Sequence, residues 1–142
     1  MATTTYSTDA AGLGTSPTTK LSGAVVGGRL RRFRAVVAFA AQADGDTIVL
    51  TTVPAGYTFA YGMINASATF GASATIAIGI TGATGKYRTA ATHTATVPTL
   101  FGLYTAADDS PLSAAETILL TVATAALPGS GSAVIDLYFS AP

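Results

Sequence analysis

The sequence has no cysteine and very little charge. The absence of cysteine excludes a disulfide scaffold, a thiolate zinc site and a cysteine nucleophile together. Charged residues make up 10% of the 142 residues, against about a quarter in an ordinary soluble domain, and seven basic residues balance seven acidic ones. A net charge of zero disfavours binding modes that neutralise many phosphates, so we expect no nucleic acid partner.

Long hydrophobic runs are also missing. The longest unbroken apolar run covers residues 35–41, whereas a membrane-spanning helix needs about 20 apolar residues. Residues 1–20 do not show the basic start and apolar stretch of a secretory signal. We therefore expect no membrane partner and synthesis in a cytoplasm. The mean hydropathy of +0.50 is explained largely by abundant alanine in a chain long enough for one domain.

The first 28 residues differ in composition from the rest of the chain. They are rich in threonine, serine, glycine and alanine, and they contain few bulky aliphatic side chains. Such a segment cannot bury a face of its own, and ordering it costs conformational entropy. The composition predicts an extended N-terminal arm over residues 1–28, followed by a β-domain over residues 29–142.

Short β-favouring runs separated by turn residues fill the rest of the sequence. The clearest alternation places Ile76, Ile78 and Ile80 on one face of a strand, with small residues between them. An Asp44-Gly45 pair, typical of hairpins, separates the first two runs. The predicted strands cover residues 33–40, 47–53, 57–64, 75–81, 86–90, 97–105, 117–123 and 133–139.

One of these strands competes with a helix. Residues 113–116 form a capping-box pattern, which is typical of a helix start. Thr117, Ile118 and Thr121 are β-branched, however, and such residues pack better on a pleated surface. We favour the strand. Seven or eight short strands without long helical runs predict an all-β antiparallel sandwich of the jelly-roll type.

Groups capable of catalysis are few. The single histidine, His93, lies among small residues with no nearby carboxylate, which favours a structural role over a place in a small hydrolase. The close carboxylate pairs, Asp44 with Asp46 and Asp108 with Asp109, adjoin turn residues, so turn formation is favoured over acid–base chemistry or calcium binding. We expect no enzyme activity, no cofactor and no metal.

The glycine-rich stretch over residues 79–86 is similar to a phosphate-binding loop but departs from that motif. Ile80 stands where the loop needs its first glycine, and Tyr87 follows the lysine where a serine or threonine would hold magnesium. The stretch predicts a hairpin loop.

Positive charge is concentrated before and within the first predicted strand, where five of the seven basic residues lie without an intervening acid. Charged side chains protect an exposed strand edge from unwanted pairing. Arginine also makes bidentate contacts with carboxylates, which suits docking to an acidic protein surface. A solvated edge and a docking patch both remain open, and nucleic acid is a third option, weakened by the lack of interleaved aromatic residues apart from Phe33. The candidate protein-interaction residues are Lys20, Arg29, Arg31, Arg32 and Arg34.

Several segments resemble small virion proteins of tailed bacteriophages, the head decoration or cement proteins and related β-sandwich components. The segments are DTIVL (46–50), VPAG (53–56), ATIAIG (74–79), ETILLTV (116–122) and AVIDLY (133–138). The resemblance implies a jelly-roll-like protein on the outside of the capsid that bridges neighbouring major capsid proteins. It also implies a homo-oligomer, with a trimer favoured, made in the host cytoplasm, and it carries over no catalytic motif.

A carbohydrate-binding or fibre or tail-associated module on the virion surface is the alternative. Sugar sites commonly offer aromatic platforms, and Tyr57, Phe59 and Tyr61 are expected to share one strand face with Met63. The sequence has no tryptophan and only one asparagine and one glutamine, which makes this alternative weaker.

Overall fold

Eight strands and one short helix follow the β-favouring runs of the sequence. The computed structural model describes residues 26–108 and 111–142, together with residues 3–5, 7, 11, 18 and 20. Most of the predicted arm therefore lies outside the described residues. The elements are β1 (Arg29–Ala38), β2 (Thr47–Val53), β3 (Thr58–Ala66), β4 (Thr75–Ile80), β5 (Ala83–Thr92), β6 (Thr99–Phe101), α1 (Tyr104–Asp108), β7 (Glu116–Ala123) and β8 (Ser132–Ala141).

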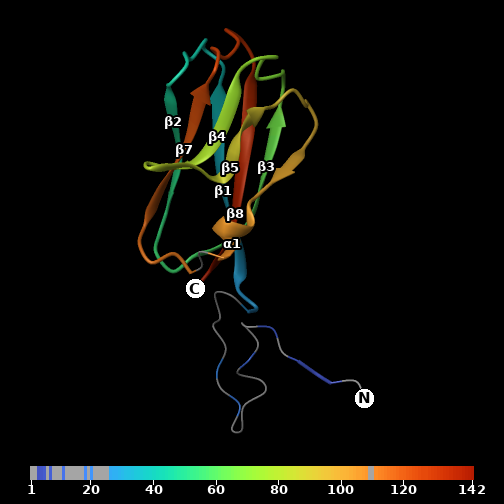
Figure 1. Cartoon of the computed structure of the whole chain (residues 1–142), viewed down its shortest axis with the longest axis vertical. Coiled ribbons are helices and arrows are strands. Elements are labelled where there is room, and N and C mark those ends of the chain that lie inside the picture. The colour runs from blue at the N-terminus through green and yellow to red at the C-terminus, as the bar shows by residue number, and fades with distance from the viewer. Residues whose placement is uncertain are drawn as a thin grey trace.

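The strands form two antiparallel sheets of four strands each, in the orders β1-β8-β3-β6 and β2-β7-β4-β5. Consecutive strands such as β1 and β2, or β7 and β8, belong to opposite sheets, so the chain wraps around the sandwich as in a jelly roll. Figure 1 shows the sheets packed face to face, with α1, the C-terminus and the start of β1 at one end. The predicted all-β sandwich is confirmed.

The core lies between the two sheets and is made of the inward residue of each alternating pair. Ile76 and Ile78 of β4 are fully buried, as the alternation predicts. Ile118, Leu120 and Val122 of β7 are also fully buried, whereas the residues between them are partly or fully exposed. This period-two burial in a strand paired on both sides settles the contested segment as a strand.

The prediction for residues 97–105 is only partly right. The strand is limited to Thr99–Phe101, and the chain then turns into the five-residue helix α1. The amides of Ala106 and Ala107 both donate to the carbonyl of Leu103, and Ala106 is fully buried. A single helical turn thus covers the end of the core where a strand would have left it open.

The predicted hairpin loop over residues 79–86 is shorter in the structure. Only Thr81 and Gly82 form the turn, and β5 starts at Ala83. The region is still a hairpin. Its loop is two residues long because the pairing of β4 with β5 extends as far as Ile80 and Ala83.

A β-bulge in β3 overturns the predicted face of that strand. The register with β8 shifts between Phe59 and Tyr61, so one extra residue is inserted and the side chains after it change face. Phe59 and Ile64 are buried, while Tyr61 is exposed and Met63 only partly buried. Phe59 therefore does not share a face with Tyr61 and Met63.

Candidate interaction surface

The four arginines of the basic segment lie on β1, which is an edge strand of its sheet. Alternation divides them between the two faces of the strand. Arg32 and Arg34 are opposite Tyr138 and Asp136 on the outer face. Arg29 and Arg31 follow the inward series of Phe33, but they project beyond the core and are exposed. The structure therefore brings the arginines to one strand edge without making them one patch.

Among the arginines of β1, Arg34 has an ion-pair partner within the described part of the chain. Its Nε and Nη2 atoms donate to the two carboxylate oxygens of Asp136 at 2.9 and 3.0 Å, which is the bidentate geometry. The hydrogen bond from Arg34 to Asp136, together with the opposite charge, raises the pKa of Arg34 above its ordinary value. Asp136 is buried on the outer side of β8, with 3% of its side chain exposed, whereas Arg34 is half exposed. Arg34 thus compensates a carboxylate of its own chain.

The remaining candidate cations are available to a partner. Arg29, Arg31 and Arg32 are exposed, and none has an ion-pair partner within the part of the chain that the structure describes. Lys20 is exposed too, but it lies before β1 and outside the β-domain. The solvated-edge and docking interpretations of the arginines both fit this placement.

The outer face of the β1-β8-β3-β6 sheet carries exposed aromatic and aliphatic side chains beside its arginines. Tyr61 and Tyr138 stack on neighbouring strands with ring centres 4.7 Å apart and ring planes at 20°. The apolar side chains exposed along this face and its edges are Leu30, Val36 and Leu100. Exposed apolar residues gathered on one face are typical of a protein contact surface.

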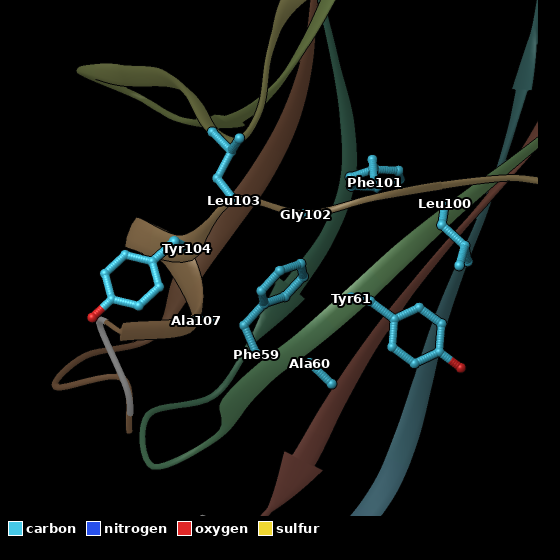
Figure 2. A pocket seen from close by; sticks show the side chains of 9 residues that line it. All are labelled: Phe59, Ala60, Tyr61, Leu100, Phe101, Gly102, Leu103, Tyr104 and Ala107. Atoms are coloured by element: carbon cyan, nitrogen blue, oxygen red, sulfur yellow. The ribbon is translucent and has the colours of Figure 1, made fainter. Parts of the chain in front are cut away.

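A cleft of about 370 Å³ lies where β3, β6 and α1 meet, and we call it the β3–β6 cleft. Figure 2 shows that Phe59, Tyr61 and Tyr104 surround it from β3 and α1, with Leu100 and Phe101 on the β6 side. Among the described residues, no charged side chain lines it. The residues that line it are Phe59, Ala60, Tyr61, Leu100, Phe101, Gly102, Leu103, Tyr104 and Ala107.

A close contact between β3 and β6 shapes this cleft. Phe101 is directly opposite Gly62, and a Cβ atom added at Gly62 would lie 2.1 Å from the Phe101 ring. Glycine is needed at this position because the aromatic ring occupies the space of a side chain. The β3–β6 cleft was not expected from the sequence, since β6 is three residues long and its partner strand is not its neighbour in the chain.

The aromatic residues considered for a sugar platform are not brought together. Tyr57 packs edge-on against Phe33, and Phe59 packs against Tyr87 and Phe139 in the core. Tyr61 lies on the outer face. The structure offers no platform made of Tyr57, Phe59 and Tyr61.

His93 is almost fully buried, and its ring packs edge-on against Phe70. Burial, and to a smaller extent the charge of Arg88, lowers the pKa of His93. Its Nε2 atom has no hydrogen-bond partner among the described residues. The ring therefore lies in the core as a packed side chain, and no described carboxylate orients it.

The other charged side chains make contacts within the fold. The Lys86 ammonium and the Tyr87 hydroxyl donate to the two oxygens of Glu116 at 2.5 and 2.6 Å. The Arg88 guanidinium donates to the carbonyls of Ala91 and Thr92 at 3.2 Å, and also to that of Ile76.

The aspartates near turns satisfy backbone amides. Asp46 accepts the amide of Ala43 at 2.7 Å, and Asp44 accepts that of Thr124 at 3.1 Å, as expected for turn residues. Asp108 differs, because it ends α1 rather than forming a turn, and Asp109 lies outside the described residues. Over the described residues there is no cluster of three or more His, Asp or Glu side chains that could hold a metal ion.

No helix in the described part of the chain is both long enough and apolar enough to span a membrane.

The sequence matches no protein-family model and no curated protein. Three chains in solved structures share its fold. One comes from the capsid asymmetric unit of cyanophage Pam1, with a TM-score of 0.56, 17% identity, and coverage of 81% of this chain and 86% of that chain. A second comes from the capsid of Ralstonia phage GP4, with a TM-score of 0.64, 16% identity, and coverage of 81% and 86%.

The third comes from an acidic stable capsid structure of the Helicobacter pylori bacteriophage KHP30. Its TM-score is 0.58 and its identity 13%, with coverage of 80% of this chain and 88% of that chain. At these identities the likeness concerns the fold. The jelly roll of this chain is thus a fold also found in chains of three phage capsid structures.

Proposed function

We propose that this chain is a structural component of a bacteriophage capsid and acts there as a decoration, or cement, protein. The observation that carries the proposal is the shared jelly roll, which covers four fifths of this chain in each of three phage capsid structures. The proposed role is non-enzymatic: the protein binds the lattice of the major capsid protein from outside and stabilises the head.

The sizes of the matched chains support an accessory role. The alignments cover slightly more of each neighbour than of this chain, so the neighbours are close to it in length. In three capsids, therefore, a jelly roll of this size is a separate chain and not a domain of a larger one. A small separate sandwich suits a protein added to a shell that other subunits build.

The surface supports protein contacts of two kinds. Arg29, Arg31 and Arg32 are exposed cations without an ion-pair partner in the described structure, and such side chains suit carboxylates on an acidic protein surface. The outer face of the β1-β8-β3-β6 sheet adds exposed apolar side chains. A ligand that binds only the assembled shell stabilises it by mass action, which is the physical basis of cementing.

The remaining parts of the proposal concern partners and place. We propose the major capsid protein as the partner, a homo-oligomer with three copies favoured, and no nucleic acid or membrane contact. The protein is made in the host cytoplasm and joins the exterior of the virion.

The test is to assemble heads of the phage that encodes the chain with and without this protein. A decoration protein is dispensable for assembly, so shells form without it, and purified protein added later sediments with them and raises their resistance to heat. If the shells fail to form without it, the chain is a shell-building subunit. If it does not sediment with complete shells, the capsid proposal is wrong.

A second measurement tests the arginines. The triple change of Arg29, Arg31 and Arg32 to serine is expected to weaken shell binding by about tenfold or more, because it removes three unpaired charges from the contact. Lys20→Ser is the companion variant that separates the lysine from the strand arginines. Unchanged binding of the triple variant would show that the arginines do not dock to the shell.

The alternative of a carbohydrate-binding or fibre module receives no support from the site. Of its three candidate rings, Tyr57 packs against Phe33 and Phe59 packs in the core. Tyr61 lies on the outer face, beyond the bulge in β3.

A further inference from the structure

The two edges of the β1-β8-β3-β6 sheet carry complementary surfaces. On the β1 edge, Leu30 is an exposed aliphatic side chain, with 53% of its surface accessible. Arg29 and Arg31 flank it in the chain, and both are exposed without an ion-pair partner in the described structure. The start of β1 thus projects an apolar side chain on the same face as the exposed Arg32, with Arg29 and Arg31 on the opposite face of the strand.

The opposite edge carries an apolar cavity beside a negative charge. The described residues that line the β3–β6 cleft are uncharged, and Leu100 and Tyr104 at its margin are 67% and 80% exposed. Asp108, at the end of α1, is exposed and accepts only a long contact of 3.4 Å from the Tyr104 hydroxyl. The cleft therefore offers what the start of β1 lacks, an apolar receptor with an available carboxylate.

The two surfaces lie at the same level of the sandwich. Arg32 on β1 and Tyr61 on β3 are both directly opposite Tyr138 on the strand between them. Figure 1 shows the start of β1 and α1 at the same end of the molecule. A contact between two different patches of one chain is head to tail, and it builds a ring where the rotation between copies closes.

From this geometry we infer that copies of the chain associate head to tail into a closed ring. The start of β1 of one copy inserts Leu30 into the β3–β6 cleft of the next, and Arg32, on the same face of β1 as Leu30, approaches the carboxylate of Asp108. The occupant of the cleft is thus a second copy of this chain, because the chain itself supplies the apolar side chain and the opposite charge. The inference deepens the homo-oligomer part of the proposed function.

The first experiment measures the mass of the full-length protein in solution by sedimentation equilibrium over a range of micromolar concentrations. The wild type is expected to form a closed oligomer. Leu30→Asp and Leu100→Asp each place a charge in the contact and are expected to weaken association by about tenfold to a hundredfold, because a buried aliphatic contact is lost. Circular dichroism checks that both variants keep the β-fold.

The matched control is Val49→Asp. Val49 is 65% exposed, close to the value for Leu100, but it lies on β2 in the other sheet. The wild-type oligomer is expected to persist in this variant. If Val49→Asp dissociates it and Leu100→Asp does not, the interface lies on the other sheet and the inference is wrong.

A mixture of the two defective variants tests the head-to-tail arrangement itself. A Leu30→Asp copy keeps a working cleft, and a Leu100→Asp copy keeps a working β1 start. One functional contact is therefore possible between them, and an equimolar mixture is expected to form a dimer and nothing larger. A mixture that stays monomeric would overturn the inference.

Charge reversal tests the electrostatic part. Arg32→Asp and Asp108→Arg are each expected to weaken the oligomer, and the double variant, which exchanges the two charges, is expected to recover most of the loss. Absence of recovery would exclude a contact between these groups.

If the wild type is a monomer and Leu100→Asp instead reduces sedimentation with shells, the cleft receives the shell protein and the self-association proposed here is wrong. Failure to bind shells with an intact ring would contradict only the capsid role.

Discussion

The outer faces of the two sheets differ although one chain and one fold produce both. The β1-β8-β3-β6 sheet exposes the stacked Tyr61 and Tyr138 and holds the buried carboxylate of Asp136 beneath Arg34. The β2-β7-β4-β5 sheet exposes several threonines together with Val49, and Thr52 and Thr117 pair across two strands at 3.2 Å. The first face has a chemistry typical of contact, and the second has that of a solvated surface.

This difference shows how a chain with 10% charged residues manages its surface. Threonine hydroxyls keep one face hydrated without charge. Several of the few charged side chains make defined contacts within the fold: Arg34 pairs with Asp136, Lys86 donates to Glu116, and Arg88 donates to backbone carbonyls of β5. A weakly charged surface resists association poorly, which agrees with an assembled working form.

The largest expected effect is a difference in stability between substitutions on the inner and outer faces of β7. Leu120 is fully buried, whereas its neighbour Leu119 lies on the outer face and is only partly buried. Leu120→Ala is expected to lower the free energy of unfolding by about 2–5 kcal/mol because it opens a cavity. Leu119→Ala is expected to cost much less. Urea unfolding of both variants gives the comparison, and equal losses would contradict the assigned face.

The next effect concerns the close approach of β3 and β6. Gly62→Val would force the Phe101 ring away and is expected to destabilise the protein by about 1–3 kcal/mol, as overpacking does. Gly129 has open space around its Cβ position, so Gly129→Ala is the matched control with little expected change. Thermal unfolding checks both. A Gly62→Val protein as stable as the control would show that Phe101 moves freely.

A smaller effect tests the ion pair that distinguishes the contact face. Arg34→Leu leaves the buried carboxylate of Asp136 without a described partner, so the melting temperature is expected to fall. The double change of Arg34 and Asp136 to leucine is expected to recover much of the loss, because both charges are then absent. Calorimetry measures the series. A single variant with unchanged melting temperature would mean that Asp136 is solvated without Arg34.

The smallest effect depends on pH. Burial lowers the pKa of His93 below its ordinary value of 6.5, so the unfolded chain binds a proton more readily than the folded one. Stability from neutral His93 is full above pH 6.5 and is lost as the pH falls below that value towards the lowered pKa. His93 is the single histidine, so His93→Leu is expected to flatten the curve between pH 7.5 and pH 5. Urea unfolding of the His93→Leu variant at both pH values checks this. The prediction is wrong if its free energy of unfolding changes with pH as much as that of the wild type.

Local sequence patterns predicted the strands well where buried and exposed side chains alternate without interruption. Thr47–Val53 has the predicted bounds, and the β-branched residues at Thr117 and Ile118 outweighed the capping box before them. The prediction failed at Phe59 and Tyr61, because a single inserted residue reverses the faces and leaves no mark in the composition. It also missed α1, whose five residues are too few for a helical period.

The candidate site was predicted only in part. The sequence singled out the arginines of β1, but the pairing of Arg34 with Asp136 joins residues 102 positions apart. Asp136, an acidic residue at an outward position of the last strand, is the signal that could have indicated a partner for these arginines. The β3–β6 cleft left no such signal, because its walls come from three elements that meet only after folding.

Composition and alternation by themselves determined the class of the fold: a β-rich chain without cysteine and with little charge, whose strands have one buried side. The physical reason is that period-two burial is a local property of each strand. The order of the strands, the division of the arginines between faces and the cleft beside α1 were decided only by the tertiary structure. These features depend on which distant strands pair and in which register, and a change of one residue in that register moves every side chain after it to the other face.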